Sequence, residues 1–148
     1  MKYILIPLVI AVCAILIFVF VSKHSVKITT AGGAHHLFVD LAENSDEKAA
    51  GLMGRDSLPE WKGMLFLYDN DAAPDFWMKN MLIPIDIIFI DADHNIKHIA
   101  ESVPPCEAKA KCELYNSGSP IRYVLEVKAG YSKKYGVAIG DKVLFWEL

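Results

Sequence analysis

The run from Ile83 to Ile90, of sequence Ile-Pro-Ile-Asp-Ile-Ile-Phe-Ile, constrains the fold more than any other part of the chain. Both faces of this run, read as an extended strand, are apolar apart from Asp86. A short run rich in β-branched residues is typical of a strand that is buried on both sides. An ionised carboxylate in such a strand needs a cation or several hydrogen-bond donors. The sequence therefore predicts a central strand in which Asp86 is held by a partner from elsewhere in the chain.

The rest of the chain is also rich in short apolar runs separated by turn residues. They predict further strands at 26–28, 37–41, 64–68, 96–102, 122–128 and 142–147. One short helix is predicted to begin after Asn44, since Glu47 three residues later completes a capping box, and to end near Gly54. Strands of this length, joined by turns, favour a mainly β fold. We predict a sandwich or small barrel of seven to eight short strands with one short helix.

The N-terminus carries a long apolar segment. Residues 4–21 hold no charge, and as a helix they would span roughly 27 Å, about the thickness of one hydrocarbon core. The segment ends in Phe-Val-Phe-Val-Ser, which is a poor site for signal-peptide cleavage. We therefore predict an uncleaved signal-anchor in residues 1–25, with a transmembrane helix that crosses the cell membrane once. Long domains translocate largely regardless of flanking charge, so residues 26–148 are predicted to form one domain outside the cytoplasm.

The charge balance bears on the partners of the chain. It has 15 Lys and Arg against 18 Asp and Glu, for a formal net charge of −3. This balance, with no basic cluster interleaved with aromatic residues, argues against a nucleic-acid partner. The arginines are Arg55 and Arg122, and arginine suits a fixed, partly buried ion pair better than lysine does. Because Arg55 directly follows the predicted helix, we predict that it is the partner of Asp86.

A candidate ligand site lies just upstream of the central strand. Trp77, Lys79 and Asn80 place a large aromatic ring, a cation and an amide within four residues. Aromatic walls suit sugar rings and other flat ligands, while amide and carboxylate groups bind hydroxyl groups. Together with Arg55 and Asp86, these three residues form the predicted ligand-binding set. The competing interpretation, which we favour, makes Asp86 structural, either in an ion pair or as a carboxylate that accepts hydrogen bonds from neighbouring backbone amides.

Two classes of function are compatible with this site. The first is a non-catalytic binding or accessory module, held at the membrane by residues 4–21, with a carbohydrate or cell-envelope component as the expected ligand. The alternative is a carboxylate-based hydrolase acting on a carbohydrate or envelope polymer. Asp86 and Glu126 would be its catalytic candidates, because glycoside hydrolysis needs two carboxyl groups roughly 5 to 9.5 Å apart. Glu126 also shares a strand face with Arg122 and Lys128, which favours a solvated charged face.

Cysteine and methionine could bind metals, but a structural role is favoured for both. Cys106 and Cys112 lie in one irregular loop, and in an exported domain this predicts a disulfide. The rival is a zinc site completed by His94 and His98, although the Cys-x5-Cys spacing is unusual for zinc. Thioethers can hold Cu(I), but core packing is the better interpretation for the four methionines between residues 53 and 81. We predict no metal site and no cofactor.

A series of short motifs runs through most of the chain. The motifs, in chain order, are Gly51-Leu52-Met53-x-Arg55, Gly63-Met64-Leu65-Phe66, Phe76-Trp77-Met78-Lys79-Asn80, Ile83-Pro84-Ile85-Asp86, Tyr123-Val124-Leu125-Glu126 and Gly140-Asp141. This series resembles the bacterial and archaeal family called domain of unknown function 192, and the resemblance covers residues 26 to 147. It implies an all-β domain with a short helix that is often exported or anchored by an N-terminal hydrophobic segment, and it implies no established activity. One departure is Met81, where the family commonly has threonine.

Overall fold

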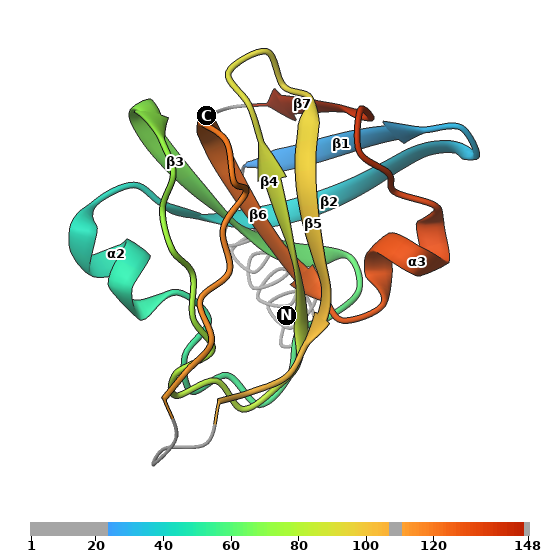
Figure 1. The fold of residues 1–148 in the computed structure, drawn as a ribbon. Coiled ribbons are helices and arrows are strands. Elements are labelled where there is room, and N and C mark those ends of the chain that lie inside the picture. Colours follow the sequence, from blue (N-terminus) through green and yellow to red (C-terminus); the bar gives the residue numbers. More distant parts are fainter. Residues whose placement is uncertain (1–23, 107–110, 147–148) are drawn as a thin grey trace, which may run out of the picture.

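The computed structural model describes residues 24–106 and 111–146 (Figure 1). Seven strands form one sheet, in the order β5-β4-β6-β3-β2-β1-β7. Strands β2 and β3 pair in parallel, and the other neighbouring strands pair antiparallel. The elements are β1 (Ser25–Thr30), β2 (Gly33–Ala42), α2 (Ser45–Ala50), β3 (Lys62–Ala72), β4 (Ile85–Ile90), β5 (Ile96–Val103), β6 (Ile121–Lys128), α3 (Tyr131–Tyr135) and β7 (Lys142–Trp146).

The sheet curls until its two edges approach each other. The turn between β4 and β5 reaches β7, where Asn95 bridges Lys142 and the N–H of Val143 donates to the carbonyl of His94 at 2.9 Å. The prediction of a mainly β domain of seven to eight strands is confirmed, with seven strands in the described residues. Of the two predicted architectures, the sandwich is wrong, because the strands form one curled half-barrel sheet, and the small barrel is present only in this half-closed form. A second short helix, α3, joins the predicted one, which is α2.

Both faces of the sheet carry an apolar core, and β4 contributes to each. Every residue of β4 is buried, which confirms the prediction of a strand enclosed on both sides. Ile85, Ile87 and Phe89 belong to the first core, with Phe66 and Val124. The second core lies on the opposite face and includes residues of β1, β2, β6 and the segment of α3. Each fully buried side chain of this size contributes roughly 1.5–3 kcal/mol, so the two cores supply most of the driving force for folding.

Helix α2 is fixed at both ends by local interactions. The Asn44 side chain accepts a hydrogen bond from the N–H of Glu47 at 2.9 Å, and the Glu47 carboxylate accepts one from the N–H of Asn44 at 3.2 Å. This reciprocal pair is the predicted capping box, and it is confirmed. The helix ends at Gly51 rather than near Gly54, and the φ of Gly51 is 47°. Glycine is favoured there because a side chain would be strained at that angle.

The predicted membrane anchor at residues 4–21 lies outside the described residues. In residues 24–106 and 111–146, no helix has the length and apolar character needed to cross a bilayer.

Candidate functional site

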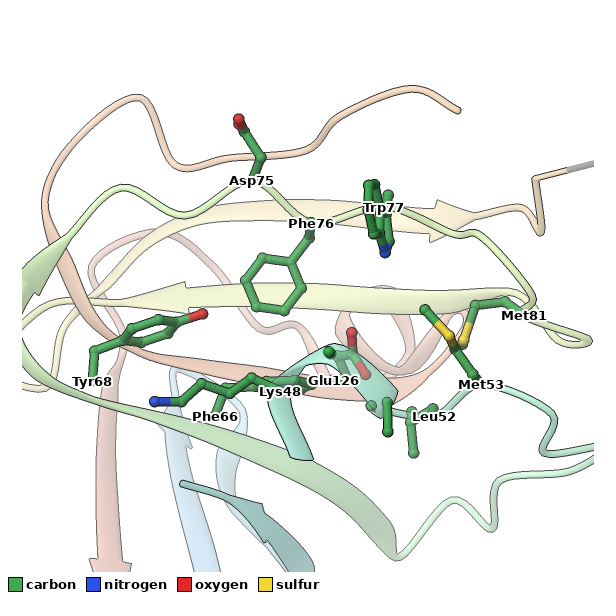
Figure 2. A pocket seen from close by; sticks show the side chains of 13 residues that line it. Lys48, Leu52, Met53, Phe66, Tyr68, Asp75, Phe76, Trp77, Met81 and Glu126 are labelled. Carbon is green, nitrogen blue, oxygen red and sulfur yellow. The ribbon is translucent and has the colours of Figure 1, made fainter. Parts of the chain in front are cut away.

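A pocket of about 200 Å3 lies between α2 and the first face of the sheet (Figure 2). Its walls are mostly apolar and aromatic, from Leu52, Met53, Phe66, Phe76, Trp77 and Met81. Its polar side chains are those of Lys48, Tyr68, Asp75 and Glu126. The pocket thus combines an apolar surface with a few polar groups, which is the usual composition of a small-molecule site.

The floor of the pocket is the side chain of Glu126 on β6. This carboxyl group is only 6% exposed, and its Oε2 atom has no hydrogen-bond partner among the described residues. Burial raises the pKa of Glu126 to about 8, and the positive charge of Arg55 opposes that rise only in part. Glu126 is therefore mostly protonated and neutral at pH 7. The predicted solvated face of this strand is wrong at Glu126, because α2 and the segment around Phe76 cover it.

Two glycines bring the chain close to this floor. A Cβ atom at Gly63 on β3 would lie 2.7 Å from the backbone oxygen of Glu126, so only glycine fits where β3 passes β6 at this point. At Gly51, a Cβ atom would lie 3.4 Å from the ring of Phe66. The end of α2 can therefore pack directly on the aromatic wall of the pocket.

The mouth of the pocket carries groups of both charges. The Lys48 ammonium lies 4.6 Å from the centroid of the Tyr68 ring, as a cation–π pair. Burial and the nearby Glu126 raise the pKa of Tyr68 to about 12, so its hydroxyl keeps its proton and can donate a hydrogen bond. The exposed carboxylate of Asp75 accepts a hydrogen bond from the side-chain amide of Asn116 at 2.8 Å. Besides Glu126, the pocket therefore offers a ligand a cation, a hydroxyl and an anion.

The aromatic wall is held rigidly by the segment that follows β3. Phe76 packs edge-to-face on Phe66 and Phe89, with ring centroids 5.1 and 5.8 Å apart. The backbone of Phe76 exchanges two hydrogen bonds of 2.8 Å with Tyr115. Trp77 points to the rim and is 51% exposed, with the Lys79 ammonium 5.7 Å from its ring centroid. The inner aromatic ring is thus fixed, while the outer one is open to contact with a ligand.

The structure brings only part of the predicted ligand-binding set to this pocket. Trp77 lines it, and Lys79 lies over the Trp77 ring. Asn80 is exposed, and its amide nitrogen lies 3.9 Å from the sulfur of Met53, which also lines the pocket. Arg55 does not line the pocket and forms an ion pair with Asp40 at 3.0 Å. Figure 2 shows the side chains that do line the pocket, and Glu126 is among them.

Asp86 is structural in this fold, and its predicted pairing with Arg55 is wrong. Its carboxylate is fully buried and accepts three backbone hydrogen bonds, at 2.8 Å from Ser102, 2.9 Å from Gly130 and 2.8 Å from Ser132. Backbone donors therefore satisfy the carboxylate without any cation, as the competing interpretation held. Gly130 and Ser132 lie at the start of α3, so Asp86 ties β4 to that helix.

The strand register separates the two carboxyl groups of the hydrolase hypothesis. Asp86 on β4 is paired with Val127 on β6, while Glu126 is paired with Ile87. Because neighbouring residues of a strand point to opposite faces, Asp86 lies on the face of the second core and Glu126 on that of the first. The two groups cannot flank one scissile bond, so the predicted catalytic pair is wrong.

The predicted disulfide between Cys106 and Cys112 is confirmed, with Cα atoms 5.5 Å apart. The sulfur atoms of Cys106 and Cys112 are therefore bonded to each other and are not thiolate ligands for the alternative zinc site. The N–H of Cys106 donates to the carbonyl of Met78 at 3.0 Å, which ties the disulfide to the segment between Phe76 and Met81. Met64 and Met78 pack in the first core, while Met53 and Met81 line the pocket. The disulfide thus supports one wall of the pocket from outside.

Replacing both Cys106 and Cys112 with serine should lower the free energy of unfolding by about 2–3 kcal/mol, since the crosslink restricts the unfolded chain. Urea unfolding of the full-length protein measures this loss. Reductant should cause a similar loss in the parent protein and none in the double variant. A parent whose unfolding midpoint ignores reductant would contradict the stabilising role.

Comparisons with family models and with solved structures show which family the chain belongs to. A family model for DUF192, described as an uncharacterised group, matches residues 26–145. No curated protein matches the chain. A solved structure of a protein of unknown function from Novosphingobium aromaticivorans DSM 12444 is 35% identical, with a TM-score of 0.76, over 82% of this chain and 84% of that one.

A second solved structure, from Sinorhizobium meliloti 1021, is described as a candidate transcription regulator. It is 36% identical, with a TM-score of 0.77, and the match covers 84% of this chain and 95% of that one. The family model and both structures span nearly all of the β domain described above. The chain therefore belongs to the DUF192 family.

Proposed function

We propose that the domain is a binding module whose small ligand occupies the Glu126 pocket. The observation that carries the proposal is the buried Oε2 atom of Glu126, which lacks a hydrogen-bond partner among the described residues and belongs to a side chain that lines the pocket (Figure 2). Buried polar side-chain atoms nearly always have a partner, so an unpaired one on a side chain that lines a pocket suggests that a ligand supplies the partner. The orphaned atom costs stability in the free protein, and a ligand that pairs with it recovers that cost.

The pocket also restricts the chemistry of the ligand. Its volume of about 200 Å3 is below the range of pockets for drug-sized molecules, so the ligand is small or inserts only one end. A neutral carboxyl group both donates and accepts hydrogen bonds, and Phe66, Phe76 and Trp77 offer apolar and aromatic contacts. The ligand therefore combines a flat or apolar body with one group that pairs with a carboxylic acid. A sugar unit of an envelope polymer, stacked on Trp77, would meet both requirements.

Fragment titration followed by 1H–15N NMR of the full-length protein tests this proposal. The library contains neutral, cationic and anionic compounds of fewer than about ten heavy atoms, in keeping with a site smaller than a drug pocket. We expect binders to shift the amide signals of Gly51 and Leu52 and the indole signal of Trp77. In Glu126→Met, which keeps the size of the side chain but removes its hydrogen-bonding atoms, those shifts should be lost or the affinity should fall at least about tenfold, as expected for a lost buried hydrogen-bond partner.

Glu101→Met is the matched control, because Glu101 is exposed on β5 and does not line the pocket. It should bind the same fragments as the parent protein. Binding that ignores Glu126, or that gathers at the second pocket beside His35 and Trp61, would contradict the proposed site.

We further propose that the module is anchored by residues 4–21 in the cell membrane, with the domain outside the cytoplasm. The disulfide supports this location, since disulfides persist in oxidising compartments. Thiol labelling of intact cells checks it: Cys106 and Cys112 should label only after reductant, without lysis. Labelling that needs lysis but no reductant would place the domain in the cytoplasm. The net charge of −3 gives no reason to extend the regulator description of the Sinorhizobium meliloti protein to this chain.

The hydrolase alternative is weaker than binding. With Asp86 on the other face of the sheet, the second carboxyl group of the pocket is that of Asp75, which is exposed at the mouth. Glu126 has the raised pKa of a general acid, but a partner carboxylate positioned beside it is needed for glycoside hydrolysis. Turnover of an envelope polysaccharide that is lost in both Glu126→Gln and Asp75→Asn would favour this alternative.

A further inference from the structure

One part of the sheet leaves large apolar side chains exposed. On the last three strands of the sheet, β2, β1 and the edge strand β7, the side chains of Phe38, Leu144 and Trp146 are each 42–43% exposed. Trp61, just before β3, is 56% exposed and packs edge-on against Phe38, with ring centroids 6.2 Å apart. We call these four residues the aromatic face. Single exposed apolar residues are ordinary, but a contiguous group of this kind marks an interaction surface.

The strand register places this face on one side of the sheet. Ser25 on β1 is paired with Phe38 on β2 and with Trp146 on β7, so the three side chains share a side. Two positions further along β1, Lys27 is paired with His36 and Leu144 on the same side. The opposite side of these strands belongs to the second core, with Val26 and Leu37. The exposure of the aromatic face is thus fixed by the register.

The charged side chains of β1 and β7 on this side are basic, and Glu60, next to Trp61, forms an ion pair with Lys134 at 2.6 Å. Lys27 lies within it, and Lys142 follows on the same side of β7, paired with Thr29 of β1. The nearest carboxylate along β2 is that of Asp40, and it forms ion pairs with Arg55 at 3.0 Å and Lys62 at 3.1 Å. Aromatic residues next to lysines are the composition that partitions into the interface of a bilayer with anionic lipids.

The sequence also determines what lies nearest to this face. The apolar run of residues 4–21 ends only a few residues before β1, and the carbonyl of His24 accepts a hydrogen bond from the N–H of Val39 at 3.0 Å. A linker of residues 22–24 spans at most about 11 Å, even when fully extended. If residues 4–21 cross the membrane, Ser25 therefore lies close to its surface, and Phe38 and Trp146 flank Ser25.

We propose that the aromatic face rests in the headgroup region of the membrane that holds the anchor, so that the domain is oriented on the bilayer and does not swing freely from a tether. The inference rests on the anchoring proposed above. The indole and phenyl rings enter the interface, and Lys27 and Lys142 contact anionic headgroups. The partner is the lipid surface itself, and no second protein is required.

Fluorescence quenching by brominated lipid tests this orientation. The full-length chain is reconstituted in vesicles of brominated phosphatidylcholine with a minor share of phosphatidylglycerol. Three variants each keep one tryptophan, at position 61, 77 or 146, with the other two replaced by phenylalanine. We expect about twofold or greater quenching of Trp61 and Trp146, since interfacial side chains reach roughly 5–10 Å into the headgroup and acyl boundary. Trp77, at the pocket rim, should be quenched much less.

A matched pair of substitutions adds a second readout. Leu144→Glu places an anion in the aromatic face and should weaken the quenching of Trp146. Leu82→Glu makes the same change at an exposed leucine outside that face and should have no effect. Equal quenching of all three tryptophans, or strong quenching of Trp77 alone, would overturn the orientation. A chain that fails to float with vesicles would instead refute the anchor, so the two failures are distinguishable.

Discussion

Glu126→Gln should make the protein progressively more stable than the parent as the pH rises from 5 to 8. The folded parent holds a proton on Glu126 up to a pKa of about 8, whereas the ordinary pKa of a glutamate, which applies in the unfolded chain, is 4.5. Between those values the folded state binds one more proton than the unfolded state, so the stability of the parent falls with rising pH. Each unit of pKa difference corresponds to about 1.4 kcal/mol, and the total is up to about 4 kcal/mol. Glutamine does not titrate and escapes this loss.

Urea unfolding of both proteins at several pH values between 5 and 8 measures the difference directly. Other titrating groups cancel in the comparison, because only residue 126 differs. Glu101→Gln is the control, and its curve should run parallel to that of the parent protein. Parallel curves for Glu126→Gln as well would show that Glu126 is solvated or already paired, and would remove the basis for the pocket as a binding site.

Asp86→Ala should lower the free energy of unfolding by about 3–5 kcal/mol, because it leaves three buried backbone N–H groups without an acceptor. The loss should appear in urea unfolding, together with faster hydrogen exchange at Gly130 and Ser132. Asp86→Asn keeps one acceptor oxygen and should lose less. Arg55→Ala should be additive with Asp86→Ala to within about 0.5 kcal/mol, since the two residues share no partner. A strong coupling between them would restore the ion pair that the structure excludes.

The different outcomes for Asp86 and Arg55 show what residue types alone can predict. An acid inside an apolar strand requires donors, and the sequence predicted that requirement correctly. It did not identify the donors, because backbone N–H groups are present at every residue and leave no mark on the pattern. Their placement at Ser102 and Gly130 depends on where β5 ends and α3 begins. In the sequence, Arg55 was the evident cationic partner for Asp86. In the fold, Arg55 forms its ion pair with Asp40 instead.

Glu126 shows the converse limit. The alternation of residues along β6 correctly predicted that Glu126 and Val124 lie on the same face of this strand. Whether that side meets solvent depends on α2, which is separated from β6 by more than 70 residues in the sequence. The one local signal was a glutamate between Leu125 and Val127 within a run of apolar residues. Gly63 was a second signal, since a glycine in an apolar strand suggests a close approach of another backbone.

The curled single sheet follows from pairings that the sequence does not reveal. Strands joined by short turns are commonly antiparallel neighbours, as β1 and β2 are. Strands β2 and β3 instead pair in parallel, because residues 43–61 form a long connection that contains α2. This connection places α2 on the first face and thereby creates the pocket. The positions of the strands and the capping box were local features, and both could be predicted, although β2 and β3 extend beyond the predicted ranges. Strand order was not local.

A 13C NMR titration of the Glu126 side-chain carboxyl group, in the full-length protein without ligand, tests the central claim most directly. An unpaired acid on the floor of an apolar pocket should titrate near its raised pKa of about 8. A fragment that binds the pocket should change that midpoint, while Glu101 should keep its own. A midpoint of Glu126 at or below the ordinary glutamate value of 4.5 would mean that the carboxylate is ionised and already satisfied, which would contradict its role as the open partner of a ligand.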